Sequence, residues 1–158
     1  MSSNNNNGSV DTRPSALFAD RVQRRQCGYL TPMLAVDKLI AAPSSAVWQV
    51  LVDLDAWPTW GPTISGARLD PPHTELGLHA TGSVRTSLGF SLPFVVTEFE
   101  AGRHWAWKVG GVPATHHRVQ PVGDHTHAAI AVPLWAMPYL TVCAIGLRRI
   151  DDMLTRST

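Results

Sequence analysis

Seven histidines in one chain raise the possibility of a metal site. His125 and His127 are two residues apart, and on a strand two such side chains share a face. His116 and His117 precede them as neighbours and would face opposite sides of a strand. If Ile130 points inward, alternation turns His125 and His127 outward. A carboxylate to complete a ligand set is not evident, so we predict no metal and no other cofactor.

Four residues are candidates for catalysis: Arg85, Glu98, His117 and Tyr139. If Arg85 and Glu98 both faced a cavity, such a pair could polarise a carbonyl group or abstract a proton. Phe94 and Phe99 have opposite parity along the same segment, so alternation leaves the direction of Glu98 open. We favour a solvated Glu98. The sequence contains no GxSxG motif and no glycine-rich phosphate loop.

Aromatic residues are numerous, with six tryptophans in 158 residues. Trp105 and Trp107 are two apart and would share a strand face. A set of such side chains with a few polar groups is typical of a pocket for an apolar ligand. The alternative is that they only fill the core. The predicted ligand-binding residues are Trp57, Trp60, Phe94, Trp105, Trp107, His117, Trp135, Met137 and Tyr139.

The first predicted elements are a strand and a helix. The strand spans 33–40, and a serine at position 44 or 45 is expected to cap the helix that follows, from Ala46 to about Leu54. Residues 55–62 contain two prolines and a glycine, which predicts a non-helical turn holding two indoles.

The remainder predicts an antiparallel meander followed by a long helix. Six short strands are expected at 64–69, 82–88, 92–100, 103–109, 115–119 and 125–132. From Pro138 onward, apolar residues recur at helical spacing: Leu140, Cys143, Leu147, Ile150 and Leu154. Gly146 inside this helix indicates either close approach of the sheet or space for a ligand, and we favour close packing. We therefore predict an α+β fold, in which a curved antiparallel sheet wraps around a long C-terminal helix and encloses a cavity.

An opening motif carries a resemblance to a known family. It consists of Ile40, Ala42, Pro43, Val47, Trp48, Leu51, Asp53, Trp57, Pro58 and Trp60. In this motif and in the order of its later segments, the chain resembles the polyketide cyclase/dehydrase branch of the START-related (SRPBCC) superfamily. The resemblance covers nearly all of the chain from about Leu34 and implies the helix-grip fold. That family includes lipid carriers, hormone receptors and cyclases.

Composition limits the partners and the location. The net charge of +1, without a clustered basic face, argues against nucleic acid. The run 128–147 carries no charge, but Pro133 and Pro138 divide it, so we expect no integral membrane span. Cys27 and Cys143 form no disulfide framework, which favours the cytoplasm.

Three domain segments are predicted: a disordered tail at 1–13, an N-terminal extension with a short helix at 14–32, and a START-like ligand-binding domain at 33–158.

Two functions remain open. One is a protein that carries or sequesters a lipid-like or polyketide-like molecule. The other is a polyketide cyclase, aromatase or dehydratase that acts on a poly-keto substrate, as the resemblance implies. The oligomeric state is left open.

Overall fold

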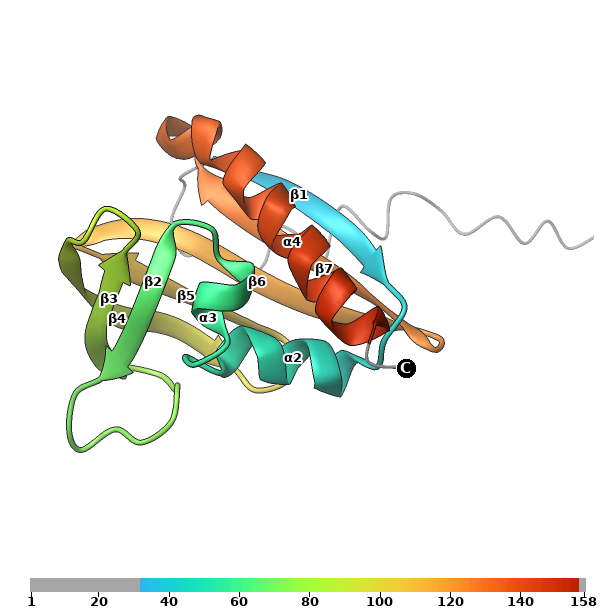
Figure 1. Cartoon of the computed structure of the whole chain (residues 1–158), viewed down its shortest axis with the longest axis horizontal. Helices are drawn as coiled ribbons and strands as arrows, with labels where there is room; N and C mark the ends of the chain where they lie inside the picture. Colours follow the sequence, from blue (N-terminus) through green and yellow to red (C-terminus); the bar gives the residue numbers. More distant parts are fainter. Residues whose placement is uncertain (1–31, 157–158) are drawn as a thin grey trace, which may run out of the picture. The chain divides into compact units, whose positions relative to one another are not determined.

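The computed structural model describes residues 32–156, in which seven strands form one antiparallel sheet of order β1-β7-β6-β5-β4-β3-β2 (Figure 1). Residues 1–31, with the predicted tail and most of the extension, lie outside the described residues. The strands are β1 (Met33–Ile40), β2 (Ile64–Leu69), β3 (Thr81–Thr86), β4 (Ser91–Glu100), β5 (His104–Val109), β6 (Val112–Val122) and β7 (His125–Pro133). The predicted meander is thus present, and β1 joins its far edge by pairing with β7.

The long helix α4 (Leu140–Thr155) crosses one face of this sheet (Figure 1). Its buried side is the predicted stripe of Cys143, Leu147 and Ile150, together with Gly146. An ion pair of 3.1 Å between Lys38 Nζ and Asp151 Oδ2 links its C-terminal half to β1. The α+β helix-grip fold predicted from the sequence is therefore confirmed.

Helix α2 (Ser44–Val52) begins earlier and differs from the prediction in its N-terminus. Pro43 occupies the position before the first turn, and no side chain caps the helix. The Pro43 carbonyl accepts hydrogen bonds from the amides of Ala46 and Val47 instead. The predicted serine cap is therefore absent.

A short helix, α3 (Trp57–Trp60), forms where we predicted a non-helical turn. Pro58 lies in its first turn, where a missing N–H removes no helical hydrogen bond. Gly61 ends the helix and donates its amide hydrogen to the Trp57 carbonyl. Pro58, which led us to predict a non-helical turn, is therefore compatible with a helix when it lies in the first turn.

Strand β4 contains a β-bulge that explains the opposite parity of its two phenylalanines. Val96 pairs with Trp107 and Glu98 pairs with Ala106, so Thr97 is an extra residue in the ladder. A bulge reverses the alternation beyond it. Phe94 and Phe99 consequently both pack on the core side, while Glu98 faces away from it.

The uncharged run 128–147 is divided among three elements: β7, the 3-10 helix η1 (Leu134–Tyr139) and α4. We predicted that the C-terminal helix begins at Pro138, but regular α-helix begins only at Leu140. Within residues 32–156, no helix combines the length and the apolar character needed to cross a membrane.

Candidate functional site

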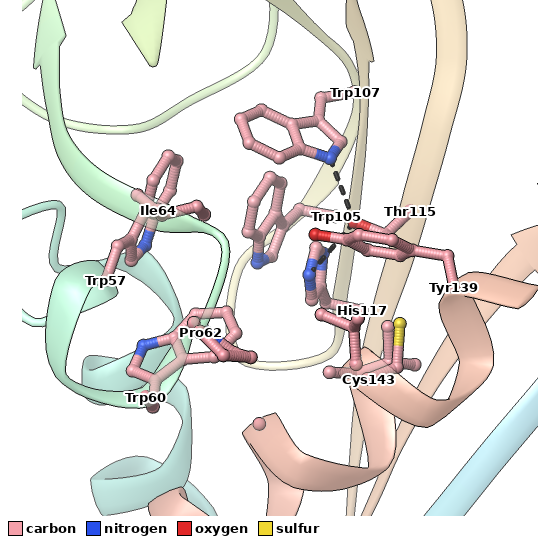
Figure 2. Close-up of a pocket in the computed structure, with 14 residues that line it drawn as sticks. Trp57, Trp60, Pro62, Ile64, Trp105, Trp107, Thr115, His117, Tyr139 and Cys143 are labelled. Carbon is pink, nitrogen blue, oxygen red and sulfur yellow. Dashed lines mark hydrogen bonds between the residues drawn. The ribbon is translucent and has the colours of Figure 1, made fainter. Parts of the chain in front are cut away.

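A small cavity lies between the sheet and the two helices α3 and α4 (Figure 2). One wall is α3 and the loop after it, the second is the N-terminal half of α4, and the floor is the inner face of β5, β6 and β7. Its volume is about 30 Å³. The lining residues are Trp57, Trp60, Gly61, Pro62, Ile64, Trp105, Trp107, Thr115, His117, Ile130, Tyr139, Val142, Cys143 and Gly146.

Three aromatic rings form a parallel stack along this cavity. The ring planes of Trp57 and Trp105 differ by 4°, with centroids 5.6 Å apart, and those of Trp105 and His117 differ by 15° at 4.1 Å. Trp107 meets both indoles of the stack edge-on. Such stacked and edge-to-face pairs each add to the stability from burial. The stack therefore joins the α3 wall to the strand floor of the cavity.

The C-terminus of α2 orients the two tryptophans of α3. Trp57 Nε1 donates to the Leu51 carbonyl at 3.0 Å, and Trp60 Nε1 donates to the Val50 carbonyl at 3.1 Å. The last carbonyls of a helix have no partner within the helix, so they are free to accept such bonds. Both indoles are therefore held in their orientations because α2 ends a few residues before α3 begins.

A short hydrogen-bonded chain runs along the strand floor. Trp107 Nε1 donates to Thr115 Oγ1 at 2.9 Å, and Thr115 Oγ1 lies 3.2 Å from His117 Nε2 (Figure 2). Thr115 reaches this position because β6 has two residues opposite Trp107, a second irregularity in the ladder. His117 is only 3% exposed. Its pKa is lowered to about 3, mainly by burial and also by the neighbouring His116, against a smaller raising effect of the Trp105 backbone, so the imidazole is neutral.

Two other titratable groups line the cavity, Tyr139 and Cys143. The Tyr139 hydroxyl lies 2.6 Å from Thr63 Oγ1, on the loop after α3. Burial raises the pKa of Tyr139, and it raises the pKa of the Cys143 thiol to about 11. All three titratable side chains at the cavity are therefore held in their neutral forms at pH 7.

Six of the predicted ligand-binding residues meet at this cavity: Trp57, Trp60, Trp105, Trp107, His117 and Tyr139. Phe94 is buried behind it, against Trp57 and Trp107. Trp135 and Met137 lie elsewhere, on η1, with 65% and 55% of their surface exposed. Pro133 ends β7, so the chain has left the sheet before it reaches these two residues.

The candidates Arg85 and Glu98 lie away from the cavity. Arg85 is exposed and borders an open hollow of about 290 Å³ over β2, β3 and β4, which contains none of the tryptophans. Glu98 is half-exposed on the outer face, 3.8 Å from His116 Nδ1 and 4.0 Å from His104 Nε2. Solvated Glu98 was the favoured interpretation of the sequence, and the bulge explains it.

The predicted outward histidines behave as surface residues. His125 is exposed, and His127 Nε2 lies 2.8 Å from Asp37 Oδ2 on the neighbouring strand. In the part of the chain that the structure describes, no group of three metal-ligating side chains gathers.

Sequence reasoning missed several lining residues. Thr115 was hidden because the irregularity in β6 shifts its alternation. Gly61, Pro62 and Ile64 were predicted as turn or strand positions, and Cys143 as part of the apolar stripe of the C-terminal helix. Gly146 offered a signal, since a glycine inside this helix predicted close packing. The close neighbour is Trp60 of α3 and not the sheet, as the prediction had it: a Cβ at position 146 would lie 3.3 Å from the Cε3 atom of Trp60.

The fold and the aromatic cavity define a helix-grip domain with an internal apolar site. A family model described as "polyketide cyclase / dehydrase and lipid transport" matches residues 33–137, and the chain belongs to that family. No curated protein sequence matches the chain significantly.

Solved structures with the same fold come from several bacteria. A protein of Mesorhizobium loti aligns with a TM-score of 0.65 at 11% identity, covering 80% of this chain and 99% of its own. A Thermobifida fusca structure gives 0.62 at 19% identity, with 78% and 93% covered. A Nitrosomonas europaea protein gives 0.60 at 16%, with 79% and 95% covered. At these identities the likeness concerns the fold.

Proposed function

We propose that this protein binds an apolar small molecule, lipid-like or polyketide-like, in the cavity between α3, α4 and the sheet, as a carrier or sequestering protein. The observation that carries the proposal is the convergence of four tryptophans on one internal cavity. Apolar ligand sites are concave, lined by aromatic side chains and equipped with few polar groups. Membership of a family described by lipid transport and polyketide cyclisation supports it. A cytoplasmic location, expected from the two cysteines, is part of the same proposal.

The cavity has to widen to admit such a ligand. Its 30 Å³ has room for about two water molecules, whereas pockets for drug-sized ligands occupy roughly 300–1,000 Å³. The two walls belong to α3 and α4, which pack through side chains and share no strand ladder. Separating them breaks the Thr63–Tyr139 hydrogen bond and leaves the sheet intact. We therefore expect the ligand to enter between the loop after α3 and the start of α4.

The neutral state of the lining residues favours binding over proton transfer. The pKa of His117 is lowered and those of Tyr139 and Cys143 are raised, so each shift disfavours the charged form of its group. A general acid or base is most effective when its pKa lies near the working pH. Arg85 and Glu98 stand outside the cavity. The cyclase alternative uses the same cavity and would be recognised by turnover of a poly-keto substrate.

Native mass spectrometry of protein isolated from its producing cells, followed by solvent extraction, tests the proposal. We expect a stoichiometric apolar adduct. The neutral fluorophore N-phenyl-1-naphthylamine should also bind to the emptied protein, with enhanced emission. Gly146→Val, which places a side chain against Trp60, should abolish binding. Thr141→Val, at an exposed position of the same helix, should retain it.

Two results would contradict this function. One is the absence of any adduct together with unchanged fluorophore emission. The other is equal binding by folded Gly146→Val and Thr141→Val proteins, which would locate the fluorophore outside the cavity. Circular dichroism of both variants serves as the folding control.

A further inference from the structure

Two buried side-chain nitrogens at the cavity have no partner within hydrogen-bond geometry, although the Trp105 backbone lies close enough to His117 to raise its pKa. Three of the four indole N–H groups lining it donate to protein oxygens: those of Trp57, Trp60 and Trp107. Within residues 32–156, the buried side-chain polar atoms without a hydrogen-bond partner are Trp105 Nε1 and His117 Nδ1. Both side chains line the cavity, and their rings are stacked on each other. Figure 2 shows this stack facing the space toward Trp60 and Pro62.

Counting hydrogen bonds assigns the tautomer of His117. Thr115 Oγ1 accepts from Trp107 Nε1 and lies beside His117 Nε2. If Nε2 accepts the Thr115 hydroxyl hydrogen, the hydrogen bonds of Trp107 Nε1, Thr115 Oγ1 and His117 Nε2 are all satisfied. Nδ1 then carries the ring hydrogen. If Nε2 were the donor, the hydroxyl hydrogen would lack an acceptor and Nδ1 would also be unpaired. The first arrangement leaves one unpaired group instead of two, so Nδ1–H is a donor.

A buried donor without an acceptor is unfavourable, because the group loses its hydrogen bond to water on burial. Each of these two nitrogens exposes less than 1 Å² in the closed structure, so water does not satisfy them while the cavity is closed. A ligand that widens and fills the cavity meets both of them. It then has to provide an acceptor of its own, or it leaves both donors unpaired.

The charge of the cavity restricts the kind of acceptor. No lysine or arginine is among the lining residues, and the His117 imidazole is neutral. A carboxylate placed here would be a buried charge without a cation, which is strongly unfavourable. A neutral carbonyl oxygen has two lone pairs and can accept from both donors without this penalty.

We propose that the ligand is an apolar molecule bearing a neutral carbonyl group, such as a ketone, ester or quinone, whose oxygen accepts hydrogen bonds from Trp105 Nε1–H and His117 Nδ1–H. This inference rests on the proposed function, since it names the ligand class of the same cavity. It distinguishes such molecules from hydrocarbons, which supply no acceptor, and from free fatty acids, which supply a charged one.

The test uses three probes of matched shape: 2-acetylnaphthalene, 2-ethylnaphthalene and 2-naphthoate. Calorimetric titration of the full chain should give an affinity about tenfold or more higher for the ketone than for either of the others. In ¹H–¹⁵N spectra, the ketone should shift the Trp105 indole N–H signal downfield. The hydrocarbon should perturb the neighbouring indole signals without this downfield shift.

Trp105→Phe removes the donor and keeps an aromatic ring in the stack. It should reduce the preference for ketone over hydrocarbon to less than about threefold. Trp60→Phe is the matched control, because that indole N–H is already bound to the Val50 carbonyl. It should weaken both probes alike and keep their ratio. If Trp105→Phe does not fold, the spectra of the unmodified protein decide alone.

The outcomes separate the two proposals. Equal affinity for ketone and hydrocarbon, with no downfield shift of Trp105, would overturn the carbonyl inference and leave apolar binding standing. Binding of 2-naphthoate as tight as that of the ketone would overturn it as well. If none of the three probes binds, the proposed function fails and the inference fails with it.

Discussion

The Tyr139 hydroxyl and Thr63 Oγ1, 76 residues apart in sequence, lie 2.6 Å from each other across the mouth of the cavity. Tyr139 ends η1 and Thr63 belongs to the loop between α3 and β2, so this hydrogen bond joins the two walls that ligand entry, as proposed, would separate. Both side chains are partly buried. The bond therefore favours the closed cavity and opposes its opening.

Tyr139→Phe should make the cavity easier to open. Removing a partly buried hydrogen bond of this kind lowers the free energy of unfolding by about 1 kcal/mol. The same amount, if it opposes opening, corresponds to a roughly fivefold faster association of N-phenyl-1-naphthylamine in stopped flow. Thr63→Val should act alike, whereas Thr63→Ser keeps the hydroxyl and should behave as the unmodified protein. Unchanged association rates in both Tyr139→Phe and Thr63→Val would exclude this role.

His117 should make the protein sensitive to acid. Its pKa is about 3 in the folded protein and about 6.5 when unfolded. Between these values the unfolded chain binds more protons, so the free energy of unfolding decreases as the pH falls through this range. The full effect is on the order of 5 kcal/mol, reached below about pH 3.

Urea unfolding at about pH 7 and about pH 4.5 measures this sensitivity. His117→Gln should lose less stability between the two pH values than the unmodified protein does. His125→Gln, at an exposed position, is the control and should follow the unmodified protein. The same pH dependence in all three proteins would show that other groups cause the acid sensitivity.

Cys143 should react slowly as long as the cavity is closed. Thiolate is the nucleophile, and a pKa of about 11 leaves little of it at neutral pH. In a Cys27→Ser background, where Cys143 is the single cysteine, we expect iodoacetamide labelling at least about 100-fold slower than for a free thiol. Urea should abolish the protection, and Tyr139→Phe should reduce it. Rapid labelling of the native protein would show an open cavity.

Trp57 and Trp135 should differ sharply in their contribution to stability. Trp57 is 1% exposed and belongs to the parallel stack, so Trp57→Ala should lower the free energy of unfolding by about 3–5 kcal/mol. Trp135→Ala removes an exposed side chain, and we expect a change below about 0.5 kcal/mol. Chemical denaturation monitored by circular dichroism measures both. Similar losses in the two variants would mean that η1 packs more tightly than its exposure indicates.

Much of the fold was predictable, because it depends on local patterns. The bounds of β1 follow from alternation, and the buried side of α4 follows from apolar residues at helical spacing. The grouping of Trp57, Trp60, Trp105 and Trp107 followed from the same elements.

Irregular backbone limited the prediction of the site. The extra residue Thr97 in β4 and the irregularity opposite Trp107 each reverse the alternation within a strand. Strict period-two reasoning therefore could not orient Glu98 or find Thr115. Trp135 is a different case, because its position depends on where Pro133 releases the chain from the sheet. The Thr63–Tyr139 contact is purely tertiary and has no local signal.

The contact between Gly146 and Trp60 has a consequence for how the protein could diversify. A glycine inside a helix is about 1 kcal/mol less favourable than alanine, yet here it makes room for an indole from α3. The size of the residue at position 146 therefore sets how closely α3 and α4 approach, and with it the depth of the cavity. If the proposed ligand binds there, a single nucleotide change from glycine to alanine at this codon would alter which ligand lengths are accepted, while the hydrogen-bonding groups on the sheet remain in place.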